Sequence, residues 1–287
     1  MSTVARRIMQ IIEPAPVIEG AGVRLKRSIG TPTLDYLDPF LLFDDFTSGN
    51  PSDYEAGFPL HPHRGIETVT YVLEGEVRHK DTLGNAGSIT AGEIQWMTAG
   101  RGIMHEEMPQ VRPGGIAGFQ LWVNLPARLK MTKPRYQDVR SSEIREITRD
   151  NGARIRVITG TVDGIAGPVT GIAVDPTYLD VLLPPHLLFT YPIERGHTAF
   201  AYVFAGEARF QDAEGAHDPL VSHPHLVIFG DGDSVEVTTG TSSVRFLLVS
   251  GQPLGEPIAR YGPFVMNTEQ EIEQTLLELR QGTFVTT

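Results

Sequence analysis

Two short windows of this 287-residue sequence hold three of its nine histidines, each close to a carboxylate. The first window reads HPHRGIE (residues 61–67) and the second reads GIMHEE (residues 102–107). Imidazole nitrogens and carboxylate oxygens together form a donor set that suits divalent first-row metals such as iron, nickel, copper or zinc. A single His-x-His pair is usually a surface feature, but two matched windows in one half of the chain predict a metal site.

Residues two positions apart on a β-strand point to the same face. His61 and His63 therefore project together, and the same rule places His105 and Glu107 on one face. If the two strands face each other across a barrel, the four side chains converge as metal ligands. Glu107 is also the candidate catalytic base, because a carboxylate beside a metal can accept a proton when one coordination arm releases. By parity Glu67 shares the face of the first two histidines, and we expect it to support the ligands or to form a structural salt bridge.

Short strands are the elements that must position these residues. Glycine, proline, aspartate and asparagine separate the runs, and the chain contains 30 glycines and 21 prolines. Strands at this spacing without intervening helices predict an all-β sandwich or barrel. The clearest runs are ETVTYVL (67–73), FQLWVNL (119–125), RIRVITG (154–160) and VRFLLVS (244–250).

An internal repeat divides the chain into two similar halves. RGIETVTYVLEGE (64–76) aligns without gaps with RGHTAFAYVFAGE (195–207), an offset of 131 positions, from Gly75 to Gly206. This offset agrees with the roughly 150 residues expected per domain. We therefore expect two tandem β-barrel domains: an N-terminal domain at 1–137 that carries the metal site, and a C-terminal domain at 138–287 that ends in a short helix.

The second domain is expected to lack the metal ligands. The offset of the repeat places His61 on Pro192, and it places His63 on Glu194. A second HPH sequence at 223–225 lies beyond the position of the first motif in the repeat. We interpret that second HPH as a surface loop.

One helix is expected near the C-terminus. Thr268 and Glu271 match a capping box, and Gly282 can end the helix. Its apolar face is formed by Ile272, Leu276 and Leu279.

The stretch 126–139 is basic and contains prolines, which indicates a linker between the domains. Its positive side chains are interpreted as solvated, with contact to an acidic partner as the alternative: Arg128, Lys130, Lys133 and Arg135.

The overall composition excludes several classes of protein. A net charge of −11 argues against direct binding to nucleic acid or an anionic membrane, because both require positive surface. The sequence has no cysteine, so disulfides and thiolate-bound metals are excluded. The N-terminal apolar run is too short for a signal peptide core, and we expect a cytoplasmic protein.

The residues around both windows resemble the pirin family, a branch of the cupin superfamily. The resemblance spans nearly the whole chain. It is carried by DPFLLFDDF (38–46), GFPLHPHRGIETVTYVLEGEVRHKD (57–81), AGEIQWMTAGRGIMHEE (91–107), LWVNLP (121–126) and GPFVMNTEQEI (262–272).

The resemblance implies a bicupin, which is two cupin-type β-barrels with one metal in the N-terminal barrel. Pirins take their ligands from the two histidines of HPH and from the histidine and second acidic residue of the later block, which are here His61, His63, His105 and Glu107. The implied metal is most often iron(II), and nickel, copper, manganese, cobalt or zinc are alternatives. Some pirins act as quercetin 2,3-dioxygenases, which implies a flavonol and dioxygen as substrates.

Three functions stay open from the sequence. Four protein ligands on a six-coordinate ion leave up to two open positions, which suits oxygenation of a substrate with an ionised hydroxyl. Trp96, Met97 and Met104 could then form an apolar wall, with core packing as the alternative. Pirins are also described as regulatory proteins, so a redox-sensitive protein that binds a transcription factor or a metabolic enzyme is the second hypothesis. The third is a closed zinc site that only stabilises the barrel.

Overall fold

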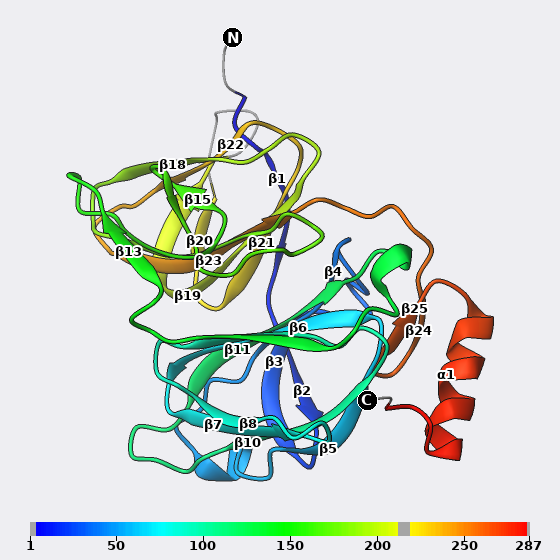
Figure 1. Ribbon diagram of the computed structural model, residues 1–287. Helices are drawn as coiled ribbons and strands as arrows, with labels where there is room; N and C mark the ends of the chain where they lie inside the picture. The colour runs from blue at the N-terminus through cyan, green and yellow to red at the C-terminus, as the bar shows by residue number, and fades with distance from the viewer. Residues whose placement is uncertain (1–3, 212–218, 286–287) are drawn as a thin grey trace. The chain divides into compact units, whose positions relative to one another are not determined.

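The computed structural model describes residues 4–211 and 219–285, which form two compact units (Figure 1). The first barrel comprises Ala15–Ser141 with Leu254–Thr287, and the second barrel comprises Met1–Pro14 with Ser142–Pro253. Strands dominate both units, and the described residues contain a single α-helix. The expected all-β class with one C-terminal helix is therefore confirmed.

The first barrel consists mainly of two antiparallel sheets. The two sheets pack against each other through a cluster of buried apolar side chains that includes Val23, Phe46, Val72 and Val77. The seven-stranded sheet has the order β12-β9-β6-β11-β4-β3-β2, and the four-stranded sheet has the order β5-β10-β7-β8. The bounds are β2 Ala15–Glu19, β3 Val23–Ile29, β4 Phe40–Asp45, β5 Phe58–His63, β6 Ile66–Glu74, β7 Glu76–Asp81, β8 Ala86–Thr90, β9 Ile94–Thr98, β10 Ile103–Pro109, β11 Ala117–Asn124 and β12 Arg135–Val139, with 3-10 turns η1 Pro51–Asp53 and η2 Ala127–Leu129.

The second barrel is built around a ten-stranded sheet whose main path is β1-β21-β19-β23-β17-β14-β13, with β18, β20 and β22 attached to it. Its interior is a large cluster of buried apolar and aromatic side chains. The bounds are β1 Ile8–Ile12, β13 Arg145–Thr148, β14 Arg154–Thr159, β15 Thr161–Val162, β16 Ile165–Ala166, β17 Thr177–Leu183, β18 Leu188–Pro192, β19 Thr198–Phe210, β20 Leu220–Ser222, β21 His225–Phe229, β22 Ser234–Thr238 and β23 Val244–Gly251.

The structure confirms that the two barrels share one plan. In the first barrel β6 lies between β9 and β11, and in the second barrel β19 lies between β21 and β23. Gly75, between β6 and β7, and Gly206, within β19, both have a positive φ, of 89° and 71°. At both positions a Cβ atom would approach a carbonyl oxygen just before the neighbouring strand, Gly115 before β11 and Ser243 before β23, so the repeat keeps glycine at this bend.

The two ends of the chain pack differently from the expected boundaries at 1–137 and 138–287. At the N-terminus β1 pairs with β21 of the second barrel. The helix α1 (Glu269–Gln281) instead packs against β24 (Ala259–Tyr261) and β25 (Phe264–Met266) of the first barrel (Figure 1). Buried Arg64 anchors the helix, because its guanidinium donates to Glu278 at 2.7 Å and to Thr275 at 3.1 Å.

The helix itself is as the sequence predicted. Thr268 is the N-cap and forms the capping box with Glu271, and Gly282 closes the helix in the left-handed conformation. No helix in the described ranges is long and apolar enough to cross a membrane.

The interpretation of Lys130 as a solvated linker residue is wrong. The side chain is 1% exposed. Its ammonium donates to the carbonyl oxygens of Gly65 and Val265, both at 2.9 Å, and to Asn124 Oδ1 at 2.7 Å. Lys130 therefore ties together three segments of the first barrel.

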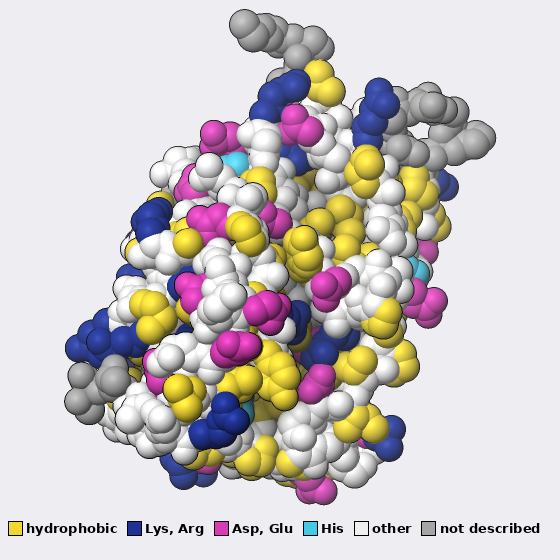
Figure 2. All heavy atoms as spheres, turned by 90° about the vertical axis from the view of Figure 1, so that its right-hand side faces the viewer, with side chains coloured by type: hydrophobic (Ala, Val, Ile, Leu, Met, Phe, Trp, Pro, Cys, Tyr) yellow, Lys and Arg dark blue, Asp and Glu magenta, His cyan; other side chains and the backbone are white. Residues whose placement is uncertain are grey.

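Charged side chains are mixed on the surface. On the face shown in Figure 2, acidic and basic groups of the described residues are interspersed rather than gathered into one basic patch. The acidic side chains on this face accord with the net charge of −11.

Candidate metal centre

The three histidines come from two neighbouring strands of the four-stranded sheet. His61 and His63 lie on β5, and His105 lies on β10, directly opposite His61 in the antiparallel ladder. The expectation that the two strands face each other across the barrel is therefore wrong. Cross-strand neighbours on one face are only about 5 Å apart, so pairing within one sheet brings the imidazoles together more closely than opposition across a barrel would.

A β-bulge lies between His105 and Glu107 in this ladder. His105 lies opposite His61, but Glu107, two residues further on β10, lies opposite Phe58, three residues back on β5. The extra residue on β5 bends the strand locally, as bulges beside functional sites commonly do.

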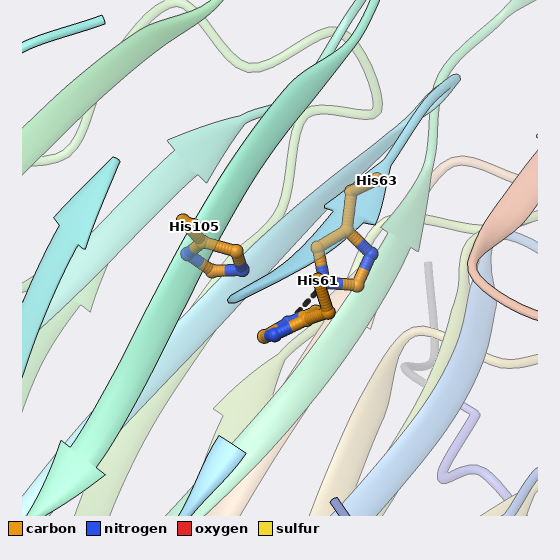
Figure 3. Close-up of side chains that lie close together, drawn as sticks. All are labelled: His61, His63 and His105. Carbon is orange, nitrogen blue, oxygen red and sulfur yellow. Dashed lines mark hydrogen bonds between the residues drawn. The ribbon is translucent and has the colours of Figure 1, made fainter. Parts of the chain in front are cut away.

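The three imidazoles converge on one point (Figure 3). Their ring centroids are 4.5 Å apart for His61 and His105, 4.9 Å for His61 and His63, and 5.1 Å for His63 and His105. The Nε2 atoms of His61 and His63 are 3.1 Å apart. On its other side, His61 Nδ1 lies 3.0 Å from the carbonyl oxygen of Pro59. That carbonyl favours a proton on Nδ1 and leaves the Nε2 lone pair directed at the cluster.

Burial favours the neutral form of two of these imidazoles, His63 and His105, by lowering the pKa of each. His63 and His105 are 2% and 1% exposed. Burial, with the two neighbouring imidazoles as smaller causes, lowers the pKa of His63 well below 6.5. Burial is also the main reason that the pKa of His105 falls to about 3, with His61 and His79 adding to the effect. Lone pairs are therefore available at neutral pH, as metal binding requires.

The cluster fits a metal ion. One nitrogen from each histidine can be chosen so that all three lie within 4.8 Å of one another. Both ring nitrogens of His105 are buried without a hydrogen-bond partner among the described residues. Buried polar atoms without partners destabilise a folded protein. A cation at the centre of the three rings would accept the lone pair of one His105 nitrogen.

Glu107 lies outside the group of three but faces the same cavity. It is 8% exposed, and its Oε1 accepts a hydrogen bond of 3.0 Å from the Thr70 hydroxyl. The same hydroxyl lies 2.7 Å from Oε1 of Gln120. Thr70, from the opposing sheet, therefore holds the carboxylate in the cavity beside the histidine cluster, and Gln120 contacts the hydroxyl of Thr70.

Glu67 does not share the histidines' face. Its carboxylate accepts hydrogen bonds from Trp96 Nε1 at 3.0 Å and from Thr98 Oγ1 at 2.6 Å, and burial raises its pKa. Thr70, three residues along β6, faces the cavity, so alternation places Glu67 on the other face of the strand. The parity argument failed because the chain turns at Gly65, with φ of 78°, between β5 and β6.

The histidines open onto a cavity of about 560 Å³ within the first barrel. This volume is in the range of small-molecule sites. Most of the wall is apolar, and two arginines and two further carboxylates lie on it. The lining includes Leu25, Leu42, Phe46, Tyr54, Phe58, Val77 and Trp122, with Glu19, Arg27, Asp44 and Arg260 as the charged groups besides Glu107.

The apolar wall expected from Trp96, Met97 and Met104 is not formed by them. Trp96 and Met97 are buried in the core, and Met104 packs against the cluster around α1. The wall residues were missed because they come from five separate strands and from the segments that follow β4 and η1. Gln120 had a usable signal, since it is a polar residue between the apolar residues Phe119 and Leu121.

Two other histidine groups lie in the second barrel. His223 of the second HPH is exposed, between β20 and β21. Asp175, Glu194 and His197 form a surface group with ligand atoms within 4.8 Å of one another, and both carboxylates are exposed.

Comparisons with known proteins agree with this architecture. A family model described as "Pirin" matches residues 22–123, and "Pirin C-terminal cupin domain" matches residues 178–285. A pirin-like protein of Caulobacter vibrioides is 46% identical over 280 residues, covering 97% of this chain and 99% of that protein. Pirin of Homo sapiens is 45% identical over 268 residues, covering 92% and 89%. The structure of a quercetin 2,3-dioxygenase from Acinetobacter baumannii superposes with a TM-score of 0.88 at 32% identity and covers 99% of each chain. The two barrels are thus cupin-type domains.

Proposed function

This chain belongs to the pirin family, and on that premise we propose that it is a metal-dependent dioxygenase that cleaves flavonols such as quercetin. One observation carries the proposal: three imidazoles converge at the wall of a largely apolar cavity of about 560 Å³. The similarity to the quercetin 2,3-dioxygenase of Acinetobacter baumannii supports it.

We assign His61, His63, His105 and Glu107 as the ligands and iron(II) as the metal. When bound, the ion supplies Lewis acidity toward an ionised hydroxyl group and a redox centre for dioxygen chemistry. The alternative metals are nickel, copper, manganese, cobalt and zinc. Elemental analysis of protein purified without chelators or nickel resin distinguishes among them.

Glu107 is assigned the proton transfer. Its carboxylate faces the cavity beside the imidazoles, and it can accept the proton of a flavonol hydroxyl that enters there. The hydrogen bond from Thr70 fixes one oxygen, Oε1, so the other oxygen is the one available to the substrate. The apolar walls exclude water and favour a planar aromatic substrate.

The test is anaerobic loading with iron(II), followed by addition of quercetin and oxygen. We expect oxygen uptake that matches loss of the flavonol absorbance. The variant H105V should show neither, and the control H223A, which changes an exposed histidine of the second barrel, should behave as the parent protein does. A fully loaded protein without oxygen uptake would overturn the proposal and leave the regulatory hypothesis, whose test is capture of partner proteins.

A further inference from the structure

Two arginines line the cavity, and their surroundings differ. Arg27 is fully engaged, since it donates to both oxygens of Asp44 at 2.7 and 2.8 Å and to Glu19 at 2.7 Å. Its charge is compensated within the protein. A ligand in the cavity gains little from this arginine, because all of its nitrogens already donate to carboxylates.

Arg260, on β24, is not engaged in this way. Its hydrogen bonds go to the carbonyl oxygens of Leu41 at 3.3 Å and Gly262 at 3.4 Å, which are long. Within residues 4–211 and 219–285 it has no carboxylate partner at ion-pair distance. The guanidinium lies over the Trp122 ring, with Cζ 5.3 Å from the ring centroid. A stacked guanidinium of this kind keeps its edge free for two parallel hydrogen bonds to an anion.

Trp122 connects Arg260 to the histidine cluster. The indole also makes an edge contact with His63, with ring centroids 5.0 Å apart. Arg260 therefore lies within about 10 Å of His63 along one wall of the cavity. An aromatic molecule of two or three rings can reach both groups at once.

We propose that Arg260 is a specificity-determining residue that binds an anionic group on the substrate, at the end remote from the oxygen that meets the imidazoles. The preferred substrate class is then an aromatic hydroxyl compound that carries a carboxylate or a second ionised oxygen. This inference rests on the proposed function for the orientation of the ligand. It extends that function, because neutral flavonols lack the group that Arg260 would bind.

The test compares ligands that differ only in this charge. The probes are 3-hydroxyflavone and its 4′- and 7-carboxylates, titrated by fluorescence into the iron(II)-loaded full chain without oxygen. We expect R260Q to weaken binding of at least one carboxylate by ten-fold or more and to change the affinity for 3-hydroxyflavone less than two-fold. R260K should recover part of the loss, because it keeps the charge without the planar fork. R280Q, which removes an exposed arginine on α1, is the matched control and should change neither affinity.

Two results would overturn the inference: equal weakening of all three probes in R260Q, or no weakening of either carboxylate. Failure of the parent protein to bind any of the probes would overturn it as well. Because the titration requires no turnover, it is independent of the oxygen-uptake test. Selective binding without oxygen uptake would therefore reject the dioxygenase proposal and keep Arg260 as an anion-recognition residue.

Discussion

The two barrels share one scaffold but fill it differently. In the first barrel, His79 on β7 pairs with Glu107 on β10, and both side chains are buried in a polar interior. In the second barrel, Phe210 on β19 pairs with Val237 on β22 at the equivalent place of the repeat. Phe210 packs against other aromatic rings of an apolar core. The cavity of the first barrel is thus a property of inward-facing side chains and not of the strand arrangement.

The same holds for the histidines. His61 lies opposite His105 in the first barrel, and the corresponding cross-strand pair in the second barrel is Tyr191 with Val235. The sequence offset had placed His61 on Pro192, one residue away. The difference arises between the strand and the aligned RG pair, because four positions separate Tyr191 from Arg195, whereas three separate His61 from Arg64. Register, which decides what faces the interior, is invisible to an ungapped alignment.

The substitution with the largest expected effect is V237E. It places a carboxylate in the second barrel at the position that Glu107 occupies in the first. Val237 is fully buried among apolar side chains, so V237E would leave a charge without a partner. We expect a loss of about 4 kcal/mol or more in the free energy of unfolding. Urea denaturation measures it. The reciprocal change E107V, in metal-free protein, should cost less than about 1 kcal/mol, and equal costs for both variants would contradict the comparison.

The second prediction concerns metal affinity. H105V gives the first barrel the residue that the second barrel has at the equivalent position, and it removes one of the three imidazoles. We expect at least a 100-fold loss of affinity for iron(II), about 3 kcal/mol, because changes outside the ligand shell already cost 10- to 100-fold. Anaerobic titration with a competing chelator measures this loss. Retention of affinity within three-fold would remove His105 from the ligand set.

The third prediction follows from the pKa of His105, which is 6.5 in the unfolded chain and about 3 in the folded protein. Between these values the unfolded chain binds the proton and the folded protein does not. Stability is therefore complete above pH 6.5 and is lost as the pH falls toward 3. In metal-free protein, lowering the pH from 6.5 to 4.5 should cost the parent roughly 2–3 kcal/mol more than H105V. Parallel stability curves for the two proteins would contradict the burial of a neutral imidazole.

The sequence predicted those features that depend on local spacing. The two-residue spacing placed His61 with His63, and the pattern from Thr268 to Gly282 predicted the helix with both caps. The repeat predicted two barrels because strands and turns recur at a fixed offset. These signals are short-range, since each depends on residues whose relative direction the backbone geometry determines.

Features that depend on distant segments were not predictable in this way. Glu67 was assigned to the wrong face because a turn at Gly65 resets the alternation. Lys130 is buried because acceptors from three separate segments surround its ammonium. The composition of the linker gives no information about those distant acceptors. Arg260 reaches the cavity only because the chain returns to the first barrel after completing the second.

The smallest effect concerns the residue that holds Glu107. Thr70 faces Glu107 in the first barrel, and the repeat places Ala201 at the equivalent position of the second, where no carboxylate needs a donor. T70V keeps the shape of the side chain and removes the hydroxyl. We expect about a ten-fold loss of iron(II) affinity, roughly 1.4 kcal/mol, because the carboxylate loses the donor that orients it. The matched control is T68V, two residues away on the same face of β6, where the cross-strand partner is Trp122. If T68V and T70V weaken iron(II) binding equally, the hydroxyl of Thr70 does not position Glu107, and the polar interior of the first barrel contributes to the site only through the ligands themselves.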